Sequence, residues 1–184
     1  MDTVLLRNLS SKLKIAPERI FREYWKLNVL KELSGEPWSS SVGFKGGTAL
    51  RLAYGSPRFS DALDFSLLRV ISVAKVFQWA RGAAQKLGLE LSDEADKRNT
   101  CLVEFRVRSD ALPQPVKLKI EVSKRPLRAP KGWYELRLRQ DTAADRRGPL
   151  RGDKKNSPPV VLRRGVRLFL LGGSQGFMRM PFSS

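Results

Sequence analysis

Apolar side chains recur at helical spacing in two long segments of the chain. In residues 16–35, "APERIFREYWKLNVLKELSG", they return every three or four positions, with Pro17 suited to the first turn and Gly35 to the end. Residues 72–87 repeat this pattern with small and apolar residues on one face. Residues 3–14 are compatible with a shorter helix. The spacing therefore predicts three helices.

Strict alternation of apolar and polar residues marks the best strand candidates. In residues 116–122, "VKLKIEV", the apolar side chains fall on one face and the charged ones on the other, and residues 100–108 alternate as cleanly. Further short strands are predicted at residues 41–46, 63–68, 87–92, 133–139 and 166–171. A short helix over residues 48–55 follows the first of these. Helices that alternate with early strands and lead into a mixed sheet predict an α/β (α+β) domain.

The regular pattern ends near residue 140. Residues 141–184 mix arginine, glycine, aspartate and proline without a period, as linkers and disordered segments do. We therefore expect one domain over residues 1–140, followed by a basic, irregular C-terminal segment that is truncated or disordered.

The composition favours a cytoplasmic protein. No apolar run reaches the roughly 20 residues of a membrane span, and residues 1–15 lack the charged, apolar and small-residue regions of a signal peptide. Cys101 is the single cysteine, which excludes an internal disulfide and a cysteine-rich zinc site.

The net charge of the chain says most about its partners. Lys and Arg number 35 against 18 Asp and Glu, a net charge of +17. Residues 125–184 hold 14 basic and 4 acidic residues, and residues 1–124 hold 21 and 14. Such an excess attracts polyanions, of which nucleic acid is the commonest in a cytoplasm. The complete absence of histidine excludes Ser-His and Cys-His catalysis, so any chemistry must use carboxylates, lysines, arginines, backbone amides or metal ions.

Residues 44–68, "FKGGTALRLAYGSPRFSDALDFSLL", carry the strongest chemical signal. Gly46 and Gly47, between a predicted strand and a helix, would let a phosphate approach the free amides of the helix N-terminus. Asp64 and Glu121 lie on predicted strands, and acids on adjacent strands can converge on a divalent metal ion that clamps a nucleoside triphosphate. Taken singly, the glycine pair is better explained as a tight strand-to-helix turn, and Asp64 and Glu121 suit a strand end and a polar strand face as well as they suit a metal site. Together they favour a nucleotide site.

The same segment resembles the signature of the AbiEii/AbiGii nucleotidyltransferases, the toxins of type IV toxin–antitoxin and abortive-infection systems. The shared elements are Lys-Gly-Gly-Thr-Ala-Leu, a short helix, Arg-x-Ser and a spaced Asp-Phe, and the resemblance extends over about residues 15–125. It implies a polymerase-beta-like fold, a small mixed sheet with flanking helices. It also implies Mg²⁺- or Mn²⁺-dependent transfer of a nucleotide monophosphate from an NTP to RNA, in some members tRNA, and a cognate antitoxin as a partner.

Position by position, the resemblance implies roles for nine residues. Asp64 and Glu121 would hold the metal, with Glu121 also the general base, and Lys119 would meet phosphate. The catalytic set is thus Asp64, Glu121 and Lys119. Nucleotide-binding roles fall to Lys45, Gly46, Gly47, Thr48, Arg58 and Ser60.

The chain departs from the family pattern at one metal-binding position. Ala62 stands where the family has its first aspartate, and Asp61, one residue earlier, would point to the other face of a regular strand. Asp61 can replace the missing ligand only if the strand start turns it inward. Two interpretations stay open: a transferase rescued by Asp61, and an attenuated or inactive relative that keeps the fold and binds nucleic acid. Residues 141–184 also lack the family's helical Ala-x-Lys and Arg-Asp elements.

Overall fold

The computed structural model describes residues 1–125, 135–136 and 160–162. The helices are α1 (Thr3–Leu13), α2 (Pro17–Gly35), η1 (Ser39–Ser41, a 3₁₀ turn), α3 (Gly46–Tyr54) and α4 (Val73–Leu87). The strands are β1 (Val42–Lys45), β2 (Ala62–Leu67), β3 (Glu90–Asp96), β4 (Thr100–Val107), β5 (Val116–Ser123), β6 (Glu135–Leu136) and β7 (Val160–Leu162).

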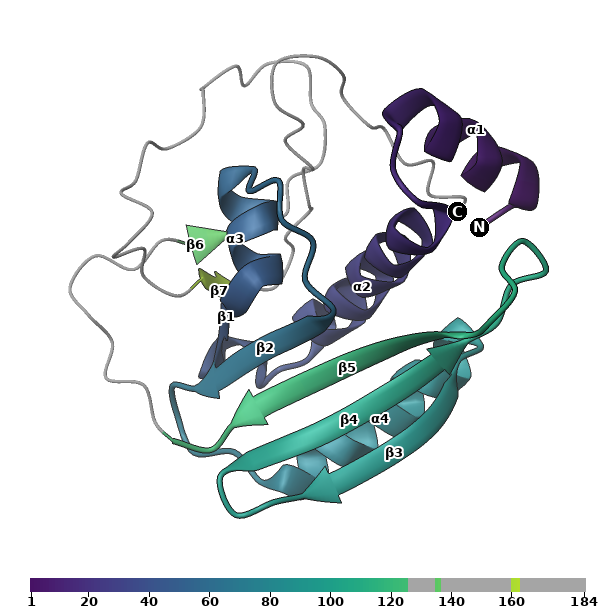
Figure 1. Cartoon of the computed structure of the whole chain (residues 1–184). Helices are drawn as coiled ribbons and strands as arrows, with labels where there is room; N and C mark the ends of the chain where they lie inside the picture. Colours follow the sequence, from purple (N-terminus) through teal and green to yellow (C-terminus); the bar gives the residue numbers. More distant parts are fainter. Residues whose placement is uncertain (126–134, 137–159, 163–184) are drawn as a thin grey trace.

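The strands form one mixed sheet in the order β3-β4-β5-β2-β1-β7-β6. Neighbours run antiparallel except for β2 with β5 and β6 with β7, which are parallel. The β2–β5 pairing is the one that matters for the site. This pairing brings β2 and β5 side by side in space, although α4, β3 and β4 lie between them in the sequence (Figure 1).

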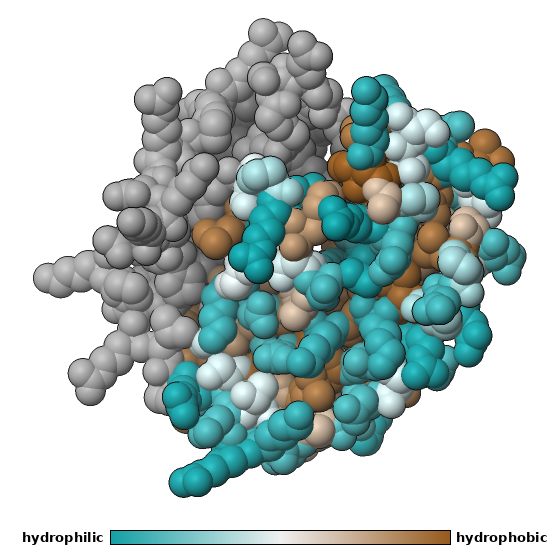
Figure 2. Space-filling view, in the orientation of Figure 1, coloured by the Kyte–Doolittle hydropathy of each residue, from teal (hydrophilic) through white to brown (hydrophobic). Residues whose placement is uncertain are grey.

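One face of the sheet is apolar and is covered by helices. In β5 the side chains of Val116, Leu118, Ile120 and Val122 are buried, and those between them point to the opposite face. Helix α2 packs against β5, and α4 packs against β3 and β4. Figure 1 views the other face, with α4 behind the strands, and Figure 2 shows mainly hydrophilic side chains over it. The polar face is therefore the accessible one.

These observations confirm the predicted α/β (α+β) class with a small mixed sheet and flanking helices. Helices α1, α2 and α4 match their predictions to within about two residues. In α2, Pro17 occupies the first turn, and the apolar stripe is buried where the helix packs against β5. Among the described residues, no helix combines the length and apolarity that crossing a membrane requires.

Three predictions about elements need correction. Helix α3 begins at Gly46, not after the glycine pair. The strand expected at residues 87–92 begins only at Glu90, because Gly88 ends α4 in a left-handed conformation. Val160–Leu162, expected in the irregular segment, forms β7 because it pairs with the free edge of β1.

The described residues leave other predictions untested. Of the strand expected at residues 133–139 the structure describes only β6, and the strand expected at residues 166–171 lies outside the described residues. The domain boundary at residue 140 stays a prediction.

Candidate active site

Two carboxylates stand side by side on the polar face of the sheet. Asp64 of β2 and Glu121 of β5 are register partners in the parallel β2–β5 ladder, so both side chains leave the same face. Burial, with the neighbouring Glu121 carboxylate second, raises the pKa of Asp64 above its ordinary value, and Lys45 and Lys119 oppose the rise. A cation bound beside these two carboxylates would offset the repulsion that Glu121 exerts on the charge of Asp64.

The N-terminus of α3 lies directly against the Asp64 carboxylate. Gly46 has a φ of +79°, and a Cβ at this position would stand 2.3 Å from Asp64 Oδ2. A Cβ on Gly47 would stand 2.9 Å from the Cβ of Ser60. Only glycine lets the helix start so close to the strand. The N-cap residue Lys45 makes no side-chain capping bond, and an open helix N-terminus favours anions.

Lys119 lies beside Ala62, the position at which the family resemblance predicts an aspartate. The register pairs Lys119 with Ala62, and the Lys119 ammonium forms an ion pair with Glu121 Oε1. The hydrogen bond to Glu121 raises the pKa of Lys119. Lys45 is the register partner of Asp64 across β1–β2. The structure thus brings two carboxylates and two lysines together on three adjacent strands.

The donor set suits a metal ion that arrives with a nucleotide. Within the described part of the chain, no group of three or more acidic or cysteine side chains is placed to hold a metal ion. Asp64 and Glu121 offer two carboxylates, and Mg²⁺ typically takes one or two from the protein and the rest of its ligands from phosphate and water. The absence of a Cβ at Gly46 lets the N-terminus of α3 lie against one of these carboxylates. The residues therefore fit a magnesium–triphosphate group.

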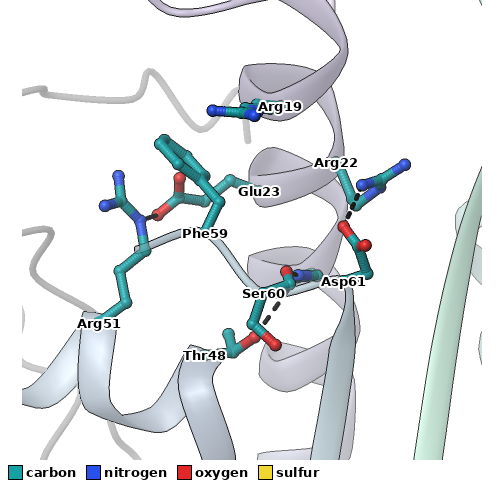
Figure 3. Close-up of a pocket in the computed structure, with 9 residues that line it drawn as sticks. Arg19, Arg22, Glu23, Thr48, Arg51, Phe59, Ser60 and Asp61 are labelled. Atoms are coloured by element: carbon teal, nitrogen blue, oxygen red, sulfur yellow. Dashed lines mark hydrogen bonds and ion pairs between the residues drawn. The ribbon is translucent and has the colours of Figure 1, made fainter. Parts of the chain in front are cut away.

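Asp61 does not join this carboxylate pair. It precedes β2, its side chain is 83% exposed, and it forms an ion pair with Arg22 of α2 (Figure 3). Arg22 also pairs with Glu18 on the same helix. The ion pair between Asp61 and Arg22 therefore links the segment that precedes β2 to α2.

Thr48, predicted to bind nucleotide, is buried in a polar network, which the half-buried Ser60 joins through its backbone carbonyl oxygen. The Thr48 hydroxyl donates to the carbonyl oxygen of Ala62 at 2.7 Å. Lys26 of α2 donates to Thr48 Oγ1 at 3.4 Å and to the Ser60 carbonyl oxygen. This network ties the first turn of α3 to the start of β2, which sets how close Gly46 comes to Asp64.

Sequence reasoning missed Lys26. Its side chain is 4% exposed, and burial, followed by the charge of Arg22, lowers its pKa to about 8. The available signal was a stripe of cations at helical spacing, Arg19, Arg22 and Lys26, beside the apolar face of α2. Periodicity alone does not tell a buried lysine from a solvated one.

A small cationic pocket lies between α2, α3 and the segment before β2 (Figure 3). The Phe59 ring lies between two guanidinium groups, with its centroid 3.8 Å from Arg51 Cζ and 5.5 Å from Arg19 Cζ. Arg51 also pairs with Glu23 at 2.8 Å. Arg58, predicted to bind nucleotide, is exposed on the same segment. The pocket lining comprises Arg19, Arg22, Glu23, Lys26, Thr48, Arg51, Phe59, Ser60 and Asp61.

Comparison with known proteins places this site in context. A family model described as nucleotidyl transferase AbiEii toxin, type IV TA system, matches residues 28–144. No curated protein matches the sequence. Two solved structures resemble the chain: JHP933 from Helicobacter pylori and a candidate nucleotidyltransferase from H. pylori, each with 25% identity and a TM-score of 0.45. Both matches cover 60% of this chain but only 45% and 47% of those chains, so the similarity spans less than half of their length.

Proposed function

The chain belongs to the AbiEii family of nucleotidyl transferase toxins, and we propose that it transfers a nucleotide monophosphate from a metal-bound NTP to an RNA acceptor. The observation that carries this proposal is the register pairing of Asp64 with Glu121 directly beside the glycine start of α3. Paired carboxylates next to an open helix N-terminus are what a metal-bound triphosphate requires. The mixed sheet with flanking helices agrees with the polymerase-beta-like fold that the resemblance implies.

The site residues divide between holding the nucleotide and moving a proton. Phosphate oxygens would bind at the first amides of α3, where Gly46 and Gly47 lie close to Asp64 and Ser60, and Lys45 and Lys119 supply positive charge on either side. A bound Mg²⁺ or Mn²⁺ would neutralise triphosphate charge, with Asp64 and Glu121 as its protein ligands. Thr48 acts indirectly, because its hydroxyl is engaged with the carbonyl of Ala62.

The transfer itself is a displacement at the α-phosphorus. The acceptor hydroxyl oxygen forms the new bond to phosphorus, the bond to the bridging oxygen breaks, and pyrophosphate leaves. Glu121 is the carboxylate that takes the hydroxyl proton, since the chain has no histidine. Arg58 and Ser60 lie on the segment before β2 and complete the proposed nucleotide contacts.

The partners follow from charge and family. A net charge of +17 favours an RNA acceptor, with tRNA as the first candidate, because its phosphates would be drawn to this surface. Membership of a type IV toxin family supports a cognate antitoxin as a further partner. We place the protein in the cytoplasm, where both would be met.

Labelled NTPs incubated with total tRNA provide the direct test. Wild type, Ala62→Asp and Asp64→Asn are compared for label transferred to RNA in Mg²⁺ and in Mn²⁺. Transfer by wild type that Asp64→Asn abolishes supports a working transferase. Transfer by Ala62→Asp alone means that Ala62 attenuates an otherwise intact site.

A second candidate function is favoured by Ala62 itself. The family's first metal aspartate is absent there, so a catalytically inactive, nucleic-acid-binding relative would keep this fold and charge. RNA binding without transfer by wild type or by Ala62→Asp would favour it. Absence of any metal-dependent nucleotide binding would sink the transferase proposal.

A further inference from the structure

We propose that Lys119 is a built-in counter-cation whose ammonium competes with a divalent metal ion for Glu121 while no nucleotide is bound. This inference rests on the proposed function for the identity of the metal-binding carboxylates. It goes further by assigning Lys119 a role toward the metal rather than toward phosphate alone. It also predicts that metal binding depends on nucleotide.

The geometry of β2 and β5 carries the first step. Lys119 and Glu121 leave the same face of β5, and the ammonium already forms an ion pair with Glu121 Oε1. A metal ion held by Asp64 and Glu121 would need that same carboxylate. Each cation lowers the affinity of this carboxylate for the other, because the two positive charges repel each other at short distance.

Ala62 explains why the lysine turns to Glu121. Register places Ala62 directly beside Lys119 on the neighbouring strand. A carboxylate at residue 62 would offer the ammonium a partner across the strands, since cross-strand neighbours on one face lie about 5 Å apart. A methyl group offers none. The ammonium therefore pairs along its own strand with the carboxylate that the metal needs.

The charges of the site agree with this interpretation. Asp64 and Glu121 carry two negative charges, and Lys45 and Lys119 carry two positive ones within the same three strands. The group is therefore close to neutral without a metal ion. A divalent cation alone would leave an excess of positive charge, whereas a cation that arrives with a triphosphate would not. The released ammonium can then pair with phosphate oxygens.

Binding of Mn²⁺ to the full chain, followed by the electron paramagnetic resonance of free Mn²⁺, tests the competition without any measurement of activity. Each variant is titrated with and without a non-hydrolysable NTP analogue at fixed salt. We expect Lys119→Met to bind Mn²⁺ about tenfold more tightly than wild type without nucleotide, the scale on which groups around metal ligands act. The nucleotide should then tighten Mn²⁺ binding less than it does in wild type.

Two variants separate charge from structure. Lys119→Arg keeps the cation and should bind Mn²⁺ as weakly as wild type. Lys117→Met removes a lysine from the same face of β5, where its ammonium pairs with Glu104 at 3.1 Å. It lies about 13 Å along the strand from Glu121 at the usual rise per residue, beyond the screening length at physiological salt. Its Mn²⁺ affinity should stay within about twofold of wild type.

The outcomes distinguish this inference from the proposed function. The competition is overturned if Lys119→Met binds Mn²⁺ no more tightly than wild type does. It is also overturned if Lys117→Met or Lys119→Arg tightens Mn²⁺ binding as much as Lys119→Met does. If Lys119→Met alone tightens Mn²⁺ binding but the wild type binds no nucleotide, the competition stands and the proposed function fails. If nucleotide binds with Mn²⁺ and Lys119→Met changes nothing, the proposed function stands and the competition fails.

Discussion

Gly46 lies so close to Asp64 that a methyl group at residue 46 would stand 2.3 Å from the carboxylate oxygen Oδ2. This contact joins the start of α3 to the central carboxylate of β2. Because Gly46 also has a φ of +79°, any other residue would meet both backbone strain and a steric clash. The closeness of helix and carboxylate therefore depends on one missing side chain.

The first prediction concerns this glycine. Gly46→Ala should lower the free energy of unfolding by about 2 kcal/mol or more, from left-handed strain and overpacking together. It should also weaken binding of a metal–NTP analogue, because Asp64 must move. Urea denaturation and analogue binding measure the two effects.

Gly82→Ala is the matched control: nothing lies within 4 Å of its added Cβ, and it lies inside α4. It should stabilise the protein by roughly 0.5–1 kcal/mol. A Gly46→Ala protein that is as stable as wild type and binds the analogue equally would contradict the close contact.

The second prediction compares two neighbouring aspartates. Asp64→Asn should weaken Mn²⁺–nucleotide binding by at least about tenfold, because it removes one of the two proposed metal ligands. Asp61→Asn should leave that affinity unchanged, because Asp61 pairs with Arg22 and lies apart from the carboxylate pair. Its cost in stability should stay below about 1 kcal/mol, since the carboxylate is largely exposed. Calorimetry of both variants decides the point. An equal loss in Asp61→Asn would instead make Asp61 the substitute for the ligand missing at Ala62.

The third prediction concerns the buried hydroxyl of Thr48. Thr48→Val keeps the shape but removes both the donor to the Ala62 carbonyl and an acceptor for Lys26. Leaving buried polar groups without partners should cost about 1–3 kcal/mol of stability. Thr48→Ser keeps the hydroxyl and should lose much less. Chemical denaturation of both variants measures this. Equal losses would mean that the methyl group, not the hydroxyl, matters at this position.

The fourth prediction is a pH dependence from Lys26. Its pKa is about 8 in the folded chain against an ordinary 10.5, so between these values the unfolded chain binds more protons. Stability from this group must therefore rise as the pH rises from about 8 to 10.5, by up to roughly 1.4 kcal/mol per pH unit. Lys26→Met lacks this contribution. The difference in unfolding free energy, wild type minus Lys26→Met, should increase over that range.

A second buried group acts in the opposite direction at the same pH. Burial raises the pKa of Cys101 to about 11 from an ordinary 9.0, so stability from the neutral thiol is lost as the pH rises through this range. Measuring both proteins in a Cys101→Ala background removes this effect. A difference between them that does not change with pH would refute the lowered pKa of Lys26.

The sequence by itself determined the main helices and strands of this protein and the residue types that are available for its chemistry. Helix α2 and strands β4 and β5 could be predicted because burial on one side imposes a period that local residues must obey. The glycine pair, Asp64 and Glu121 could be selected because few residue types suit a phosphate turn or a metal. The absence of histidine excluded most other chemistry. Each of these conclusions depends only on residue type and local spacing.

Only the tertiary structure decided which of these residues meet. Parallel pairing of β2 with β5 sets Asp64 beside Glu121 and Ala62 beside Lys119, and no local pattern encodes that register. Packing of α2 against the start of β2 turns Asp61 to Arg22 and buries Lys26 beneath Thr48. Contacts between distant segments depend on how whole faces fit together. For that reason the partners of Asp61, Lys26 and Lys119 became visible only in the folded chain.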